Sequence, residues 1–142
     1  MVFRITTLIL AALVIFLLLK PGPGPLRTIE VRNSLIHGRG VFCLRPFKAG
    51  QTIEIVPTIK YDKEKEFTKD SVLTVYDIHY KDEHAFMLGY GAIYNHSDEN
   101  NAEWGWRDDG DLEVVAKRDI KQGEEICVNY GEEYWSRRSD KK

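Results

Sequence analysis

The chain has 142 residues, of which 43% are hydrophobic, and it carries a formal net charge of −2. This length, without an internal repeat or a low-complexity tract, suits one modest globular domain with a single core. Residues 1–27 contain three basic residues and no acid, so residues 28–142 carry a net charge of −5. An acidic domain disfavours direct binding of nucleic acid and suits a basic peptide as partner.

An uncharged, mostly apolar run over residues 5–19 lies between Arg4 and Lys20. As a helix it would be about 22 Å long, against a hydrocarbon core of about 30 Å, so it crosses a membrane only with help from its flanks. The same length suits a signal-peptide core, and a buried core helix is a third reading. The Pro/Gly linker over residues 21–27 offers no small-x-small cleavage site free of proline, which favours an uncleaved membrane anchor over residues 1–20.

The alternation of apolar and polar residues that is typical of strands begins at Thr28. The strands that it predicts are short and closely spaced, and they lie near residues 29–31, 41–42, 53–55, 104–106, 112–115 and 124–130. Asp109-Gly110 provides the turn of a β-hairpin between the fourth and the fifth of these strands. The pattern therefore predicts a compact, mainly β domain over residues 28–135.

Three stretches do not follow the strand pattern. Residues 61–67 are charged and irregular, which indicates a loop or a short helix. Residues 73–80 fit a helix or a strand equally. After the last strand, residues 132–138 could form one helical turn, and a charged tail over residues 136–142 follows the domain.

Three motifs succeed one another along the predicted strands. His37-Gly38-Arg39-Gly40 precedes an apolar strand, Asn95-His96-Ser97 ends an apolar run, and a later strand ends in Asn129-Tyr130-Gly131. Alone, the second motif is better explained as a polar turn that caps the next element. In this order, and together with Asn101-Ala102 and Tyr134-Trp135, the set resembles the SET-domain protein lysine methyltransferases, and most of all the minimal viral and bacterial SET proteins.

The resemblance covers residues 28–135 and implies a SET (β-clip-like) fold of several small sheets. In this fold the Asn95 segment and the strand leading to Tyr130 meet in a knot-like crossing, and cofactor and peptide reach a narrow channel from opposite sides. The implied cofactor is S-adenosyl-L-methionine, whose methyl group is transferred to a lysine amine. The cysteine-rich zinc segment that follows many SET domains has no counterpart after Trp135.

The resemblance assigns catalysis to two tyrosines. Tyr130 matches the family's motif tyrosine, whose phenol oxygen lies near the transferred methyl group and orients the amine. Tyr76 lies upstream of Asn95 at the distance where the minimal SET proteins carry a second active-site tyrosine. Without the resemblance, each tyrosine is about as well explained as a core residue. A general base at His96 is a weaker alternative, because the family uses this residue for structure and binding.

The resemblance draws the cofactor-binding residues from the glycine turn, the Asn-His pair and the C-terminal aromatic pair. They are His37, Gly38, Arg39, Gly40, Asn95, His96 and Trp135. The glycines let the backbone approach the methionine end of the cofactor, and Arg39 can also meet its carboxylate. We expect the Asn95 side chain at the methionine amino group and the His96 backbone at the adenine edge. Trp135 is either a lid over the adenine or an apolar cap of the core.

Val128 occupies the position two residues before Tyr130, where the family often has Phe or Tyr. An aromatic residue there limits how many methyl groups are added. Valine cannot hydrogen-bond a water in the substrate channel, and it leaves space. We therefore expect more than one methyl group per lysine.

The two cysteines and four histidines do not predict a metal site. Cys43 and Cys127 each lie in an apolar, strand-like run, where a buried free thiol is expected. The histidines are His37, His79, His84 and His96. No pair among these residues has the close ligand spacing of structural zinc, so we expect no metal.

The resemblance implies a lysine-containing protein or peptide as substrate, with a basic, histone-like tail as the leading class, and it allows a homodimer. Because S-adenosylmethionine is a cytosolic metabolite, we expect the domain to face the cytoplasm from a membrane anchor; a soluble nuclear or cytoplasmic protein is the alternative. The alternative function is a non-catalytic SET-like module that binds a peptide at the membrane. Automethylation, or methylation of a small amine, is a further one.

Overall fold

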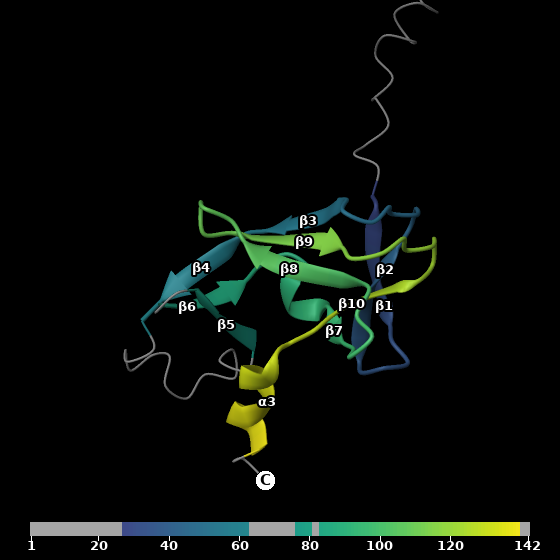
Figure 1. Ribbon diagram of the computed structural model, residues 1–142. Helices are drawn as coiled ribbons and strands as arrows, with labels where there is room; N and C mark the ends of the chain where they lie inside the picture. The colour runs from purple at the N-terminus through teal and green to yellow at the C-terminus, as the bar shows by residue number, and fades with distance from the viewer. Residues whose placement is uncertain (1–26, 63–75, 81–82, 140–142) are drawn as a thin grey trace, which may run out of the picture.

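The computed structural model describes residues 27–62, 76–80 and 83–139. This part of the chain is mainly β, as predicted, and its strands form three small sheets (Figure 1). The strands are β1 (Ile29–Asn33), β2 (Arg39–Cys43), β3 (Thr52–Val56), β4 (Thr58–Tyr61), β5 (Asp77–Tyr80), β6 (Glu83–Met87), β7 (Asn95–His96), β8 (Ala102–Trp106), β9 (Leu112–Ala116) and β10 (Glu125–Val128). A 3-10 turn, η2 (Gly91–Ile93), precedes β7, and a helix, α3 (Glu132–Ser139), follows β10.

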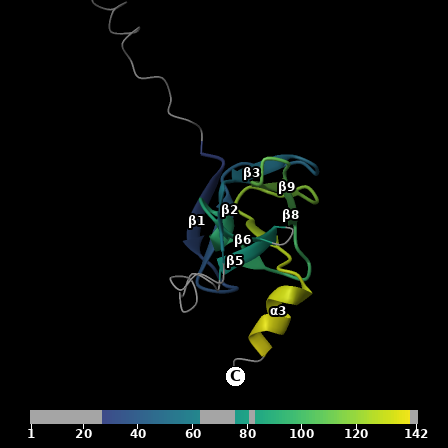
Figure 2. The same cartoon turned by 90° about the vertical axis from the view of Figure 1, so that its left-hand side faces the viewer.

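The three sheets have the strand orders β1-β2-β10-β7, β3-β9-β8 and β4-β6-β5. In Figure 1 the β3-β9-β8 sheet lies across the top of the domain, with the other two sheets below it on opposite sides. The helix α3 projects away from the sheets in both Figure 1 and Figure 2. It confirms the helical turn expected over residues 132–138, and β5 decides the ambiguous stretch before Tyr80 in favour of a strand.

The hairpin predicted around Asp109-Gly110 is present as β8 and β9. In β9 the side chains at Leu112, Val114 and Ala116 are buried, and those between them are half-buried, which is the period of two expected for a strand with one face on the core. Gly110 has a φ of +89°, which favours glycine at this turn. Sequence pattern and turn chemistry therefore agree on this hairpin.

The strand β10 is the centre of the first sheet. It pairs antiparallel with β2, with Ile126 opposite Val41, and parallel with β7, with Cys127 opposite Asn95. The Asn95 segment and the strand leading to Tyr130 therefore lie side by side. The knot-like crossing that the resemblance implies for them stays a prediction. Four-residue β10 is buried at Ile126, Cys127 and Val128, because it has neighbours on both edges and the core beneath it.

The apolar core is formed mainly by the β1-β2-β10-β7 and β3-β9-β8 sheets, and Ile78 and Met87 of the third sheet pack against it. Its largest fully buried side chains are Tyr94, Ile120, Ile126, Val41, Val56, Val114, Val128 and Cys43. Both cysteines are buried free thiols, as expected. Burial raises the pKa of the Cys127 thiol to about 11 and also raises that of Cys43, so both stay protonated near neutral pH.

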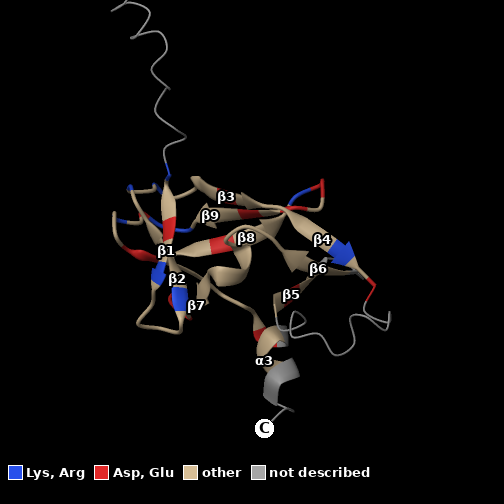
Figure 3. Cartoon of the chain, turned by 180° about the vertical axis from the view of Figure 1, so that it is seen from behind, with Lys and Arg blue, Asp and Glu red and all other residues tan. Residues whose placement is uncertain are grey.

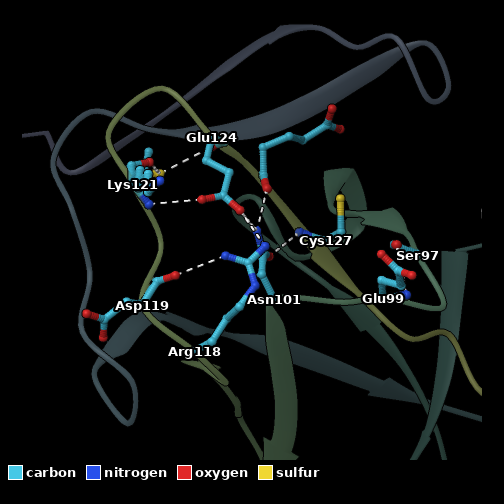
Figure 4. Close-up of polar contacts among 10 residues, drawn as sticks. Ser97, Glu99, Asn101, Arg118, Asp119, Lys121, Glu124 and Cys127 are labelled. Carbon is cyan, nitrogen blue, oxygen red and sulfur yellow. Dashed lines mark hydrogen bonds and ion pairs between the residues drawn. The ribbon is translucent and has the colours of Figure 1, made fainter.

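Buried Asn101 fixes β10 to the β7–β8 connection (Figure 4). Its side-chain amide donates to the Glu125 carbonyl oxygen at 2.7 Å, and its side-chain oxygen accepts from the Cys127 N–H at 2.9 Å. These contacts hydrogen-bond the buried side chain, which would otherwise be costly to bury. Asn101 thus orders the strand that leads to Tyr130.

The turn before β10 is held by an ion pair between Arg118 and Glu124 (Figure 4). The Glu124 carboxylate also accepts from the Lys121 N–H at 3.0 Å, across the turn that leads into the strand. The hydrogen bond from the Arg118 guanidinium has the largest effect on the Glu124 carboxyl. Together with the hydrogen bond from Lys121, it lowers the pKa of Glu124 to about 2. The ionised carboxylate is therefore part of the folded turn.

The acidic residues of the described part are spread over several elements. Figure 3 shows acidic positions on β1, β8, β9 and α3, and basic positions on β1, β2 and β4. Both signs of charge therefore occur around the domain, and neither gathers on a single sheet.

Several sequence-based expectations lie outside the described residues. They concern the anchor over residues 1–20, most of the linker, residues 63–67, residues 73–75 and the end of the charged tail. Within the described ranges, no helix combines the length and the apolar character that crossing a membrane requires.

We expect Glu124 to contribute stability that is fully present above about pH 4.5 and is lost as the pH falls toward 2. The sign follows because the folded pKa is lowered to about 2, whereas the unfolded chain has the ordinary value of 4.5. Glu124→Gln should lower the free energy of unfolding near neutral pH by about 1 kcal/mol, a figure reduced for solvent screening. Urea unfolding between about pH 7 and pH 3 measures this.

Exposed Asp108 provides the matched control, since Asp108→Asn removes the same charge from a solvent-facing turn. The expected difference is a flatter pH dependence in the Glu124 variant alone. Equal slopes in the wild type and in Glu124→Gln would contradict the assignment.

Candidate functional site

The glycine turn and β7 are joined by the side chain of Asn95. Asn95 is 5% exposed, and its amide nitrogen lies 3.1 Å from the His37 carbonyl oxygen, 3.2 Å from that of Arg39 and 2.7 Å from Glu125 Oε1. Glu125 Oε2 in turn accepts from the Ser34 hydroxyl at 2.9 Å. One buried amide therefore fixes the backbone of the turn against β7 and β10.

Glycine is needed at two positions of this turn, for two different physical reasons. Gly38 has a φ of +49°, in the left-handed region that side chains other than glycine rarely adopt. Gly40 is buried, and a Cβ atom at this position would overlap Glu125 Oε1 and lie 3.0 Å from Asn95 Nδ2. Gly38 thus allows the turn, and Gly40 allows its contact with Asn95, while His37 and Arg39 stay exposed.

Tyr130 follows β10 and is fixed at both its backbone and its phenol. Its N–H donates to His96 Nδ1 at 3.2 Å, and its hydroxyl donates to the Tyr94 carbonyl oxygen at 2.6 Å. His96 Nε2 lies 3.2 Å from Asp98 Oδ1. Because Nδ1 accepts from Tyr130, the ring proton belongs on Nε2, where it is donated to Asp98. His96 therefore positions Tyr130.

The partly buried carboxylate of Glu54 holds the side chain of Tyr94. Glu54 accepts from the Tyr94 hydroxyl at 2.8 Å and from the Tyr90 N–H at 3.0 Å. Burial raises the pKa of Glu54, and the two hydrogen bonds oppose that rise. Burial and the Glu54 charge together raise the pKa of Tyr94, so its hydroxyl remains a donor. The turn that carries the Tyr94 carbonyl is thereby held in place beneath the Tyr130 phenol.

Aromatic rings surround Tyr130. Trp104 stacks on it at 6.1 Å between ring centroids, and Tyr134 contacts it at 4.4 Å. Trp135 lies 6.2 Å from Tyr130 and packs edge-on against His96 at 5.0 Å, while its side chain remains 48% exposed. The helix α3 thus brings two aromatic residues to Tyr130, and Trp135 is a partly exposed ring beside His96.

A pocket of about 240 Å³ opens next to Tyr130. Its aromatic lining residues are Tyr76, Tyr94, Trp104, Trp106, Tyr130 and Tyr134. Tyr76 is 51% exposed and lines the pocket, and its role as a second active-site tyrosine stays a prediction. Tyr130 both lines the pocket and contacts His96, so it joins the pocket to the residues predicted to hold the cofactor.

The structure places the sequence-predicted residues in two groups that share Tyr130. The glycine turn, Asn95, His96 and Trp135 form one group, and Tyr76 belongs to the pocket. Val128 is fully buried in the core, opposite His96 in the strand pairing, and it is not among the pocket-lining residues. A direct contact between Val128 and the pocket therefore does not support its predicted influence on the number of methyl groups.

Sequence reasoning missed four residues of this arrangement: Glu54, Trp104, Trp106 and Tyr134. The alternation of Trp104 and Trp106 indicates a strand, but a sequence does not say that both line a pocket. Tyr134 enters the sequence argument only as the neighbour of Trp135. A carboxylate in an apolar strand, as at Glu54, was the one available signal of a buried polar contact.

We expect Gly40→Ala to lower the free energy of unfolding by about 2 kcal/mol, because the new methyl group displaces Glu125 and Asn95. Hydrogen exchange of the turn should become faster, because its hold on Asn95 is lost. Gly105→Ala is the control: nothing lies within 4 Å of a Cβ atom there, so the change should stay within about 0.5 kcal/mol. Equal effects of the two substitutions would refute the packing argument.

Comparisons with known proteins give one consistent family. Residues 38–131 match the SET domain. The chain is 32% identical over 111 residues to the histone-lysine N-methyltransferase, H3 lysine-37 specific, of Schizosaccharomyces pombe, covering 75% of this chain and 76% of that protein. It is 30% identical over 114 residues to the histone-lysine N-methyltransferase set9 of Aspergillus terreus, covering 76% of this chain and only 18% of that longer protein.

A solved structure agrees with the sequence matches. A Plasmodium falciparum protein, named for histone methyltransferase activity, has a TM-score of 0.63 and 31% sequence identity, covering 78% of this chain and 99% of that chain. The family match includes the glycine turn from Gly38, the Asn95-His96 pair and Tyr130. The particular likeness to minimal viral and bacterial members stays a prediction. The chain belongs to the SET-domain family of protein-lysine methyltransferases.

Proposed function

We propose that this chain transfers a methyl group from S-adenosylmethionine to a lysine side chain of a basic, histone-like tail or of another protein. The observation that carries the proposal is the position of Tyr130. Its phenol lines an aromatic pocket, while its backbone and ring contact His96 of the predicted cofactor group. A lysine entering the pocket would therefore meet the cofactor at Tyr130.

The reaction requires a neutral lysine amine, because an ammonium group has no lone pair to attack a methyl group. Lysine has an ordinary pKa near 10.4, so holding it neutral at about pH 7.4 costs roughly 4 kcal/mol. An apolar, aromatic channel disfavours the charged form and thereby lowers the amine's pKa. Tyr76, Trp104 and Tyr134 provide such walls beside Tyr130.

The hydrogen bond from Tyr130 to the Tyr94 carbonyl determines what the phenol does toward the amine. Its proton is donated to that carbonyl at 2.6 Å. The phenol oxygen therefore acts toward the substrate as an acceptor for an N–H of the amine. Accepting from the amine orients its lone pair, which is the alignment that in-line transfer needs. Tyr130 is the catalytic residue of the proposal, and Glu54, Tyr94 and His96 position it.

The residues present suit S-adenosylmethionine in their chemistry. It would supply the methyl group, carried on a sulfonium sulfur. The exposed turn at His37 to Arg39 offers backbone groups and a cationic side chain to the amino-acid end of the ligand. The half-exposed ring of Trp135, packed on His96, offers a stacking surface to the adenine. Gly40 and Asn95 would hold the turn in position.

A basic tail is the substrate class favoured by charge and by similarity. Residues 28–142 carry a net charge of −5, which favours encounter with a basic peptide. The relatives from Schizosaccharomyces pombe and Aspergillus terreus are named as histone-lysine methyltransferases. The rival function is a non-catalytic module that binds a peptide without turnover, and cofactor binding distinguishes the two.

The place of action is proposed from the sequence. A membrane anchor over residues 1–20 would tether the domain, with its active site facing the cytoplasm where S-adenosylmethionine is made. The named histone methyltransferase relatives suit instead a soluble nuclear or cytoplasmic protein. A homodimer is allowed by the resemblance alone.

We expect the full chain to transfer labelled methyl groups from S-adenosylmethionine to at least one of a panel of basic protein tails. Tyr130→Phe should lower the rate at least a hundredfold, because the orienting oxygen is removed while the ring and its packing stay. Tyr90→Phe is the matched control, since the Tyr90 ring packs against the core and is not part of the pocket lining. Scintillation counting of the tails measures the transfer.

Transfer that survives in Tyr130→Phe would remove Tyr130 from its catalytic role. Absence of both transfer and calorimetric S-adenosylmethionine binding in the wild type would favour the binding-module alternative. Label that appears only on the chain itself would indicate automethylation.

We further expect more than one methyl group per lysine on the best tail peptide. The expectation comes from the resemblance, in which an aromatic residue at the position of Val128 limits methylation; Val128 itself lies outside the pocket, which has about 240 Å³ of space. Mass spectrometry of the peptide over a time course measures the outcome. Strictly single methylation, with excess enzyme and cofactor, would disprove this expectation.

A further inference from the structure

The β5–β6 hairpin groups three potential metal ligands, Asp77, His79 and His84. Asp77 and His79 are two residues apart on β5, so their side chains lie on the same face of the sheet. His79 is directly opposite His84 in the strand pairing, which places the third side chain on that face as well. One ligand atom from each residue lies within 4.8 Å of the other two.

The group is sheltered and already partly oriented. The Asp77 side chain is 6% exposed and that of His84 is 17% exposed. Asp77 Oδ2 lies 2.6 Å from His84 Nδ1 and accepts from the Tyr61 hydroxyl at 2.9 Å. The His79 and His84 rings meet edge to face at 4.2 Å. Tyr61 also stacks on Phe86 at 4.2 Å, which fixes the hydroxyl that orients the carboxylate.

We propose that Asp77, His79 and His84 form a binding site for a divalent transition-metal ion, with Zn²⁺ as the best-suited ion. Two imidazole nitrogens and one carboxylate are a common ligand set for zinc, which leaves a fourth position for water. Ligands at about 2.0–2.2 Å from a tetrahedral ion lie about 3.4 Å from one another. Binding therefore needs small side-chain movements, and the Asp77–His84 hydrogen bond is replaced by two bonds to the ion.

A plain Asp–His hydrogen bond is the competing explanation for this group. It accounts for the contact between Asp77 and His84. The ring contact with His84 also contributes to the position of His79. What favours the metal site is that one ligand atom from each of the three residues lies within 4.8 Å of the other two, and that Tyr61 orients the Asp77 carboxylate as an outer partner does. The sequence did not reveal the group, because its spacing combines a two-residue step in one strand with a cross-strand pair.

The site adjoins the pocket, since Asp77 and His79 are among its lining residues. A bound divalent ion would add two positive charges where a cationic peptide enters, and like charges repel more strongly where water is partly excluded. The ion should therefore raise the KM for a basic peptide more than it lowers kcat. This consequence rests on the proposed methyltransferase function, whereas ion binding itself does not.

The test uses the full chain, freed of metal with a chelator, and does not depend on activity. Calorimetric titration with Zn²⁺ should show one equivalent bound at micromolar or tighter affinity. His79→Ala and Asp77→Asn should each weaken binding at least tenfold. Tyr61→Phe keeps all three ligands and the stacked ring, and it should weaken binding about tenfold. Asp108→Asn, an exposed acid in the β8–β9 turn, should leave the affinity unchanged.

Cobalt(II) provides a second, spectroscopic readout. A tetrahedral site with nitrogen and oxygen ligands gives visible absorption bands, and these should appear in the wild type and be lost in His79→Ala. Circular dichroism and melting of each metal-free variant show whether it is folded. Should Asp77→Asn fail to fold, His79→Ala and Tyr61→Phe still test the proposal.

Three outcomes would overturn the site. These are the absence of Zn²⁺ binding to the folded wild type, equal affinity in the wild type and all ligand variants, and cobalt spectra dominated by sulfur charge transfer from Cys43 or Cys127. Zinc binding without methyl transfer would support the metal site and contradict the proposed methyltransferase function. Transfer without zinc binding would do the reverse.

Discussion

Two residues of β7 pair in parallel with two residues of β10, and the site takes its geometry from that pairing. It places Asn95 next to Glu125, where the amide holds the glycine turn, and His96 next to the backbone of Tyr130. Both strands are short and buried, so a shift by one residue would turn every one of these side chains to the wrong face. Strand register thus determines the chemistry that the site can perform.

Buried and partly buried polar groups secure this register. Asn95, Asn101 and Glu54 each hydrogen-bond two or more groups from segments that are distant in the sequence. Burying an amide or a carboxylate is costly unless it is paired, so these contacts tolerate few alternative arrangements. The apolar core alone would stabilise several packings of such short strands. The polar side chains select the packing in which the Tyr130 phenol reaches the Tyr94 carbonyl.

Sequence reasoning predicted those features of the fold that depend on local sequence patterns. The β8–β9 hairpin followed from alternation and an Asp-Gly turn, and the buried thiols followed from their apolar surroundings. The family followed from three motifs in order, and it implied the meeting of Asn95 with the strand to Tyr130. By contrast, the aromatic pocket around Trp104 and Tyr134 and the Asp77 group depend on cross-strand register and on where α3 packs. Neither cross-strand register nor the packing of α3 produces a motif with fixed spacing in the sequence.

The strand order β1-β2-β10-β7 also bears on how the domain folds. The last strand of the described residues, β10, lies inside its sheet, between β2 and β7, which both precede it in the sequence. During synthesis, one edge of β2 therefore stays unpaired until β10 has left the ribosome. Val41, which is buried in the folded domain, is exposed to solvent in that interval. Contacts of such large sequence separation form slowly, because loop closure must precede them. The nascent domain thus depends on a late C-terminal strand to cover the open edge of β2, and that open edge is the place where aggregation would start.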